Sequence, residues 1–337
     1  MKTFRVVLTF VSSVSFVFLG HRPVSAQIYE TVGTRAQGMG GAFVAVADDA
    51  TATWWNPAGL ILTYFSAVAE QSEIDDPQDA PSVGPVSRSV PRSFAVTFPA
   101  LGLSYYRLRI SEIAPAISTE TGQAVRQDLG VAATGVRSRL LNEFGATVGQ
   151  SLGGHVILAS TFKIVRAGVV TAPSGSLDDA SALDVPLETS GDLDIGGLVR
   201  FGRTRVGVTV KHLNEPTFGE GKGALVLKRQ ARAGIAWIGG QPLGPAMITT
   251  AFDADLTKTS TLVGDVRHIS AGAELLLTRQ KVSLRGGISS NTLGDVTNSG
   301  SFGASIGVLQ GVYLDGAKTF GSDRSRSGWS VGLRLTI

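Results

Sequence analysis

Most of the chain after residue 61 alternates between apolar positions and small or polar positions. Residues 205–211 show the pattern clearly. The apolar side consists of Val206, Val208 and Val210, and the opposite side consists of Arg205, Gly207, Thr209 and Lys211. A period of two places the two sets on opposite faces of a sheet, so the pattern predicts β-strands.

Fourteen segments of this kind follow one another, and most have roughly the length of a tilted strand that spans a bilayer. Their ranges are 62–71, 92–99, 101–111, 139–151, 154–167, 190–201, 204–212, 227–238, 245–256, 266–277, 280–290, 300–308, 311–320 and 327–337. The number is even, as in the barrels of bacterial outer membranes.

The connections alternate in length. Those at 72–91, 112–138, 168–189 and 213–226 are long and polar, and 291–299 is moderate. Tight turns are predicted at Pro99-Ala100, Leu152-Gly153, Gly202-Arg203, Thr278-Arg279 and Leu309-Gln310, whereas 239–244 is looser. Short periplasmic turns that alternate with long surface loops are typical of outer-membrane barrels. We therefore predict an all-β fold, an antiparallel transmembrane β-barrel of about 14 strands over residues 62–337; a soluble β-rich periplasmic protein is the alternative.

The composition agrees with a membrane barrel. Only 17% of the 337 residues are charged, and a lipid-facing wall cannot hold many charges. The chain has no cysteine, which excludes disulfide frameworks, thiolate metal sites and cysteine nucleophiles.

The first 26 residues have the features of a secretory signal peptide. Lys2 and Arg5 precede an apolar stretch from Val6 to Gly20, and small residues precede a cleavage site after Ala26. A membrane anchor is disfavoured because the run is short. Removing residues 1–26 takes away three basic residues and no acid, which leaves 27 − 27 = 0 net charge. The net charge of +3 of the full chain therefore comes from this segment and does not indicate nucleic-acid binding. The protein is expected outside the cytoplasm.

Residues 27–61 differ from the strands and are predicted to form a compact segment ahead of the barrel. Asp48 and Asp49 precede a stretch suited to a short acid-capped helix. Pro57 would end that helix and hold Asn56 extended. Glycines in the segment permit tight turns and close backbone approach. Such a segment, placed before the first strand, is suited to fold into the barrel.

Residues 33–60 also carry a family resemblance. The block reads GTRAQGMGGAFVAVADDATATWWNPAGL. It resembles the opening of mature chains in the PorV/PorQ family of outer-membrane proteins, which is related to the FadL-like superfamily of long-chain fatty-acid transporters. The resemblance implies an N-terminal plug, or hatch. The positions that carry it are Arg35, Gly38, Gly40, Gly41, Asp48, Asp49, Trp54, Trp55, Asn56, Pro57, Ala58 and Gly59.

Two roles remain open for the aromatic part of this block, since Trp54, Trp55, Asn56 and Pro57 could pack the plug against the wall or contact a ligand. The resemblance also leaves two functions open. The first is a FadL-like channel for hydrophobic small molecules. The alternative is a PorV-like barrel that binds or shuttles secreted cargo in type IX secretion. Expected partners are outer-membrane lipid, hydrophobic small molecules or secreted proteins, and the barrel-assembly machinery, although the terminal Ile337 departs from the aromatic end of many barrels.

Signals for catalysis or metal binding are weak, and neither an enzyme nor a cofactor is predicted. The pattern G-x-S-x-G occurs at 149–153 and 303–307, but the first match spans a predicted turn and the second lies in a predicted strand. His155, His212 and His268 are scattered in the sequence. Asp253 and Asp255 share a predicted inner face, where they could pair with Arg205, Lys211 or Arg232.

Overall fold

The computed structural model describes residues 32–75, 86–115, 134–220, 224–240, 246–261, 264–277, 281–294, 296–322 and 326–337. The predicted signal peptide, its cleavage site near Ala26 and residues 27–31 of the predicted plug lie outside these ranges. The same holds for the predicted turn Thr278-Arg279, for half of the connection 72–91 and for most of the connection 112–138.

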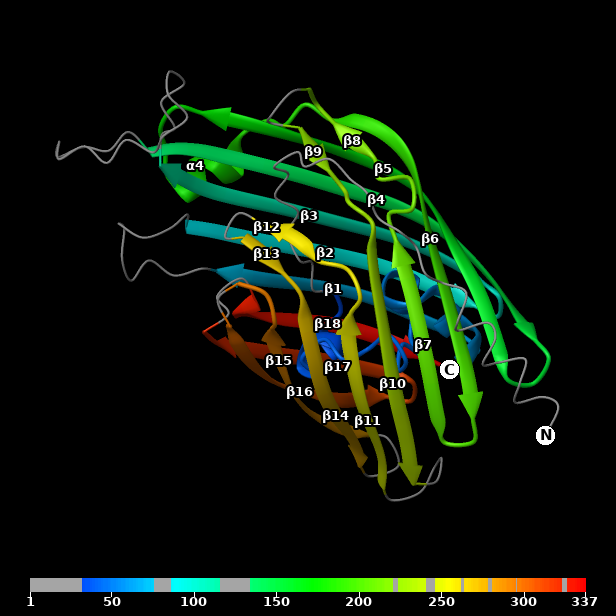
Figure 1. The fold of residues 1–337 in the computed structure, drawn as a ribbon. Helices are drawn as coiled ribbons and strands as arrows, with labels where there is room; N and C mark the ends of the chain where they lie inside the picture. The colour runs from blue at the N-terminus through cyan, green and yellow to red at the C-terminus, as the bar shows by residue number, and fades with distance from the viewer. Residues whose placement is uncertain are drawn as a thin grey trace.

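Fourteen of the described strands close into an antiparallel barrel (Figure 1). They are β1 (Ser66–Asp75), β2 (Val86–Phe98), β3 (Leu101–Pro115), β4 (Thr134–Leu152), β5 (Val156–Ala172), β6 (Glu188–Phe201), β7 (Thr204–Lys211), β10 (Gln230–Gly240), β11 (Ala246–Asp255), β14 (His268–Leu277), β15 (Val282–Asn291), β16 (Asn298–Leu309), β17 (Val312–Gly321) and β18 (Gly328–Thr336). Each barrel strand pairs with the next along the chain, and β1 pairs with β18 from Ser66↔Thr336 to Ile74↔Gly328 to complete the ring. The fold prediction is confirmed.

All fourteen predicted strand segments correspond to barrel strands, with differences at their ends. The first was predicted at 62–71 and begins instead at Ser66. A 3₁₀ helix, η1 (Pro57–Leu62), occupies its expected start, because Asn56 caps this helix through its side chain and Pro57 fits its first turn.

The predicted alternation of connections gives the barrel two different ends. We call the end with tight turns the turn end; it includes Pro99-Ala100 and Gly202-Arg203, as predicted. Two further turns lie one or two residues later than predicted, at 153–155 and at Gln310-Gly311. The opposite end, with the longer connections, is the loop end. At the loop end β4 and β5 extend several residues beyond their predicted limits, and β3, β4 and β5 reach 15, 19 and 17 residues.

Residues 173–187 fold back over the outer face of this extension. They contain α4 (Leu177–Ala182), whose capping box joins Ser176 and Asp179. Hydrogen bonds from the Ser176 backbone and side chain hold the pKa of Asp179 below its usual range. Arg109 of β3 donates to the carbonyl of Leu183 at 3.3 Å, and Arg88 of β2 pairs with Asp178 at 3.0 Å. The outer face of β3–β5 is therefore covered by polar protein at its loop end.

The two faces of the wall are inverted relative to a soluble protein. On β7, Val206 and Val208 are 43% and 44% exposed, whereas Thr209 and Lys211 on the opposite face are 3% and 9% exposed. The alternation predicted for residues 205–211 is thus confirmed, with the apolar side facing out. The well-exposed aromatic side chains of the outer face include Phe94, Phe98, Phe144, Phe162, Phe201, Trp237, Phe252, Phe302, Phe320 and Trp329. A lipid-facing wall requires an apolar outer band of this kind.

Two small hairpins lie within loop-end connections. They are β8 (Thr217–Phe218) with β9 (Leu225–Val226), and β12 (Thr259–Thr261) with β13 (Gly264–Val266). Phe218 and Leu225 of the first hairpin pack with Leu108, Leu141 and Val165 of β3–β5 in a buried apolar cluster. The first hairpin therefore covers part of the inner wall near the loop end.

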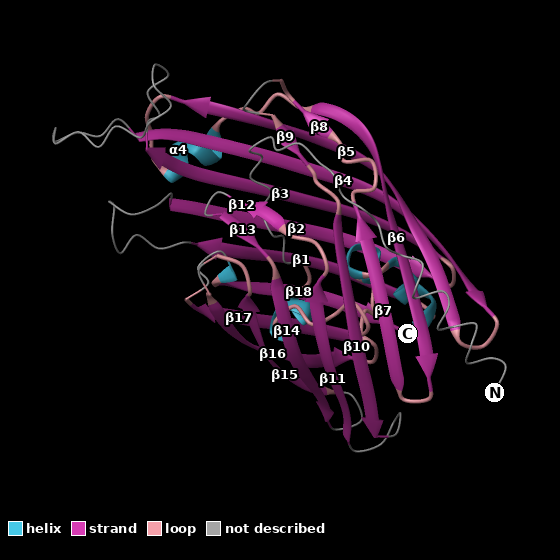
Figure 2. Cartoon of the chain, in the orientation of Figure 1, coloured by secondary structure: helices cyan, strands magenta, loops and turns pink. Residues whose placement is uncertain are grey.

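Ahead of β1 lie three short helical elements: α2 (Thr34–Gly38), α3 (Ala52–Trp55) and η1. Figure 2 shows several short helical turns among the strands of the ring, whereas α4 lies beside the end of β3. None of the described helices is long and apolar enough to cross a membrane.

Candidate functional site in the barrel lumen

Residues 32–62, called here the lumenal segment, fill the interior of the barrel. Among residues 32–60, all except Asp48 are buried. The segment reaches opposite walls of the ring: Thr34 donates its backbone N–H to Glu70 of β1 at 2.9 Å, and Asn56 donates to the carbonyl of Gly197 on β6 at 3.1 Å. Figure 1 shows it in blue among the strands. A buried segment that contacts opposite sides of a closed ring can only lie inside it.

Glycines on both partners allow the segment to approach the wall closely. Gly40 has φ +66°, and a Cβ there would lie 2.8 Å from the backbone nitrogen of Ile288. On the wall, a Cβ at Gly272 or Gly287 would overlap the backbone of Met39. Within the segment, a Cβ at Gly59 would overlap the carbonyl of Ala47. The close approach expected of the glycines is confirmed.

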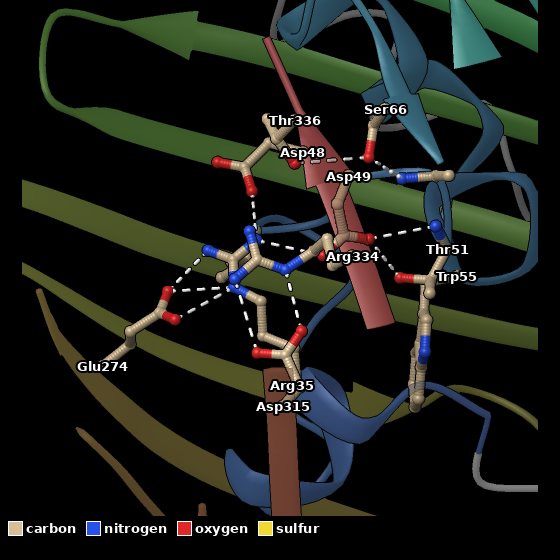
Figure 3. Close-up of polar contacts among 12 residues, drawn as sticks. Arg35, Asp48, Asp49, Thr51, Trp55, Ser66, Glu274, Asp315, Arg334 and Thr336 are labelled. Carbon is tan, nitrogen blue, oxygen red and sulfur yellow. Dashed lines mark hydrogen bonds and ion pairs between the residues drawn. The ribbon is translucent and has the colours of Figure 1, made fainter. Parts of the chain in front are cut away.

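The side chain of Arg35 is the centre of a buried ion-pair network (Figure 3). Its guanidinium lies 2.5 Å from Asp48 and 3.2 Å from Asp49 of the same segment. It also lies 2.5 Å from Glu274 of β14. Arg35 is only 9% exposed, so these carboxylates replace the water that its charge would otherwise require.

The network continues along the wall on both sides of Arg35. Glu274 also pairs with Arg285 of β15 at 2.7 Å, and Asp315 of β17 lies 3.3 Å from Arg285 and 3.0 Å from Arg334 of β18. On the other side, Asp48 pairs with Arg205 of β7 at 3.3 Å. Alternation indicates that such residues share the inner face, but not which of them meet.

A second wall contact holds the backbone of the segment. Asp253 of β11 accepts hydrogen bonds from the backbone N–H groups of Phe43 and Val44 at 2.7 and 2.8 Å. Arg232 of β10 lies 3.6 Å from Asp253 and 3.4 Å from Asp255. The predicted inner-face pairing of these aspartates with Arg232 is therefore confirmed.

The turn that carries the tryptophans follows from its local sequence. Asp49 accepts a hydrogen bond from the backbone N–H of Thr51 at 3.0 Å, and α3 starts just after it. The N-cap residue is Thr51, which makes no side-chain capping bond, so the predicted acid cap is wrong in detail: Asp49 lies two residues before the cap. Asn56 is extended at φ −158°, ψ 104°, as predicted for the residue before Pro57. Its amide donates to the carbonyl of Val44 at 2.9 Å.

Trp54 and Trp55 form the floor of a cavity of about 40 Å³ on the loop-end side of the segment. Trp54 packs against Tyr106 of β3, with ring centroids 4.7 Å apart, and Lys211 Nζ lies 3.1 Å from its centroid. Trp55 donates from Nε1 to the carbonyl of Val32 at 2.7 Å. Both roles considered for these side chains are thus compatible with their positions: they pack the segment and they line a cavity. Ala58 packs in a separate apolar cluster with Ile157 and Leu198.

A separate buried ionic cluster lies on β4–β7. Lys163 Nζ is 2.9 Å from both Asp192 and Asp194, and 3.6 Å from Glu143. His212 Nδ1 lies 2.7 Å from Asp192. The histidines are scattered in the sequence, but His212 is not isolated in the structure, because the pairing of the consecutive strands β6 and β7 brings it beside Asp192. Asp192, Asp194 and His212 are close enough for metal ligands, but both carboxylates already form ion pairs with the Lys163 ammonium.

The two G-x-S-x-G matches lie where the sequence predicted. Residues 149–153 end β4 at its turn, and residues 303–307 lie within β16. Ser305 hydrogen-bonds Asp315 and Arg285 rather than a histidine. Neither match lies at the strand-to-helix turn of a nucleophile elbow.

The fold is shared with solved structures of channels and transporters. A Pseudomonas aeruginosa FadL homologue superposes with a TM-score of 0.56 at 11% identity, over 93% of this chain and 100% of the homologue. The Ralstonia pickettii toluene transporter TbuX gives 0.58 at 12%, over 91% and 98%. The CymD monoaromatic hydrocarbon channel gives 0.55 at 12%, over 94% and 99%. The chain thus has the barrel fold of these FadL-type proteins.

Comparison of the sequence itself gives less. No protein-family profile matches the chain, and no curated protein matches it.

Replacing Gly287 with leucine is expected to displace the lumenal segment, because even a Cβ at this position would overlap the backbone of Met39. Overpacking of this kind typically costs about 1–3 kcal/mol. The measurement is limited proteolysis of the reconstituted barrel, in which the segment should become cleavable. Gly316→Leu is the matched control, since a Cβ at Gly316 meets nothing within 4 Å. Equal resistance to protease in both variants would contradict the packing described here.

Proposed function

We propose that this protein is an outer-membrane channel for hydrophobic small molecules, in which residues 27–61 act as a plug and residues 62–337 form the conducting barrel. The observation that carries the proposal is the tryptophan-floored lumen inside a barrel of the FadL type. TbuX is described as a toluene transporter and CymD as a monoaromatic hydrocarbon channel, which supports the same class of ligand here. An outer-membrane location accords with the exposed apolar band.

An apolar route leads toward the tryptophans from the loop end. The cluster that includes Phe218, Leu225 and Leu141 lines this end of the lumen. A small void of about 10 Å³ lies beside Leu108, Leu141, Tyr106 and Trp54, and it is also bordered by Glu143, Arg92 and Arg107. Under this proposal a hydrophobic solute follows these apolar contacts, passes Glu143 and reaches the plug without crossing the ionic network around Arg35.

The structure corresponds to a closed state under this proposal. A cavity that binds benzene has a volume of about 150 Å³, whereas the cavity above Trp54 and Trp55 has about 40 Å³. Passage of a ring-sized solute therefore requires movement of these side chains or of the plug. The ion pairs of Arg35 with Glu274 and of Arg232 with Asp253 oppose this movement.

The proposal is tested by transport into liposomes. Purified protein should accelerate the entry of radiolabelled toluene and of a long-chain fatty acid over protein-free liposomes, while glucose stays excluded. Deleting residues 33–60 should admit glucose as well. Trp54→Ala should alter hydrocarbon entry, and Trp237→Ala, on the outer face, is the matched control. Identical uptake by the intact and deleted proteins would rule the channel out.

A secretion role is the second candidate. It is supported by the resemblance of residues 33–60 to the PorV/PorQ family, and by the loop-end extension of β3–β5, which offers a surface for cargo. Under this proposal residues 1–26 are a signal peptide, and the protein receives help from the barrel-assembly machinery. Affinity capture from outer membranes should recover secreted proteins or translocon subunits. Recovery of assembly factors alone would speak against it.

A further inference from the structure

Three arginines form one row across the outer face of β2–β5. Arg92 lies directly opposite Arg107, Arg107 opposite Asn142, and Asn142 opposite Arg166. Arg92 and Arg166 are exposed and Arg107 is partly exposed. Since side chains alternate along each strand, the row lies on the same face as Phe94 and Phe144, two residues farther along β2 and β4.

The position of the row relative to the apolar band is clear from the register. Three successive rows on the turn-end side are almost wholly apolar: Phe98–Leu101–Val148–Ser160, Val96–Leu103–Ala146–Phe162 and Phe94–Tyr105–Phe144–Ile164. On the loop-end side lies residue Arg109, which is bound to the covering segment 173–187. The arginine row therefore lies at the loop-end edge of the lipid-facing band, where headgroups begin.

The row contains no acid. It continues to Gln71 of β1 on one side and to Thr189 of β6 on the other. Glu73, one row farther toward the loop end, lies 3.7 Å from Arg88. Within the described part of the chain, the guanidinium groups of Arg92, Arg107 and Arg166 have no hydrogen bond or ion pair. Like charges directly opposite each other destabilise a sheet, so this arrangement favours an external anion.

We propose that the row of Arg92, Arg107 and Arg166 binds the phosphate of an anionic membrane lipid. The acyl chains of this lipid lie on the apolar rows toward the turn end. Guanidinium groups bind phosphate through paired, charge-assisted hydrogen bonds. Tyr105 and Phe144, with ring centroids 4.7 Å apart, offer the acyl chains an aromatic surface next to the row on its turn-end side. Tyr105 donates its hydroxyl to Asn142 at 3.0 Å, which marks the change from apolar to polar contact. This site is separate from the lumen and does not depend on the channel.

The test is a lipid titration of the full barrel in neutral detergent, read by native mass spectrometry. Phosphatidic acid should bind more tightly than phosphatidylcholine. The variant Arg92→Gln/Arg107→Gln should bind phosphatidic acid about tenfold more weakly, which corresponds to about 1.4 kcal/mol, or one charged contact. The control Arg203→Gln/Lys281→Gln removes two exposed charges at the turn end and should leave the affinity unchanged. Both variants should show the heat-modifiable migration of a folded barrel.

Added glycerol phosphate separates the lipid from its free headgroup. We expect it not to compete at concentrations at which phosphatidic acid saturates, because it lacks acyl chains. Competition by glycerol phosphate at equal concentration would overturn the assignment to a lipid. Equal affinity of the native protein and of Arg92→Gln/Arg107→Gln, or no preference for phosphatidic acid over phosphatidylcholine, would overturn the site itself.

Discussion

Replacing Arg35 with methionine is expected to lower the free energy of unfolding by about 3–5 kcal/mol and to release the lumenal segment. The physical reason is that removing one partner of a buried ion pair leaves the other charge without compensation. Here three carboxylates, Asp48, Asp49 and Glu274, lose the same guanidinium. The first measurement is the urea midpoint of the barrel. The second is glucose entry into liposomes, which should rise as the lumen opens.

Two further variants show whether the effect is specific. Arg229→Met removes an arginine that is 3.9 Å from Glu215 and about one third exposed, so its effect should be small. Combining Arg35→Met with Glu274→Gln should restore part of the lost stability, because one uncompensated charge is removed. An Arg35→Met protein with the native midpoint and native exclusion of glucose would refute the role of this network.

Replacing Lys163 with methionine is expected to destabilise the other side of the barrel by a comparable amount, about 3–5 kcal/mol. The ammonium is the common partner of Glu143, Asp192 and Asp194, and all three acids are almost fully buried. Since these residues come from β4, β5 and β6, the loss should appear as a lower midpoint of barrel unfolding. The lumenal segment, held mainly elsewhere, should remain protected from protease at temperatures below unfolding.

The control for Lys163 is Lys258→Met. Lys258 pairs with Asp265 at the loop end, but both side chains are well exposed, at 54% and 39%. Exposed pairs contribute about 0–1 kcal/mol. Adding Asp194→Asn to Lys163→Met should recover part of the stability. Equal midpoints for Lys163→Met and Lys258→Met would contradict the account of the buried cluster.

The strands of the wall were readable from sequence, because their signal is local. The alternation at Val206–Val210 identifies both a strand and its outward face, and the turn residues delimit the hairpins. The conformation of the lumenal segment was also partly readable, since Asn56 and Pro57 restrict their own backbone. Strand ends were less accurate at β4 and β5, where polar residues that suggested a loop continue the sheet beyond the apolar band.

The candidate site depends on contacts between residues far apart in the chain. Arg35 and Glu274 are separated by 239 positions, and Phe43 and Asp253 by 210. Alternation placed Asp253 on the inner face and left Arg205, Lys211 and Arg232 as possible partners, and the structure shows that Arg232 is the one that pairs. The cluster around Lys163 was missed, because His212 meets Asp192 only through the register of β6 and β7.

The sequence by itself determined the number of strands, the outward direction of the apolar side chains and the alternation of turns and loops. These features depend on neighbouring residues and on the two-residue period of an extended chain. Only the tertiary structure decided how residues 32–62 fill the lumen, which carboxylates surround Arg35 and that three arginines align on the outer wall. The reason is that closure of the ring and the register between strands, rather than any local preference, place these side chains together.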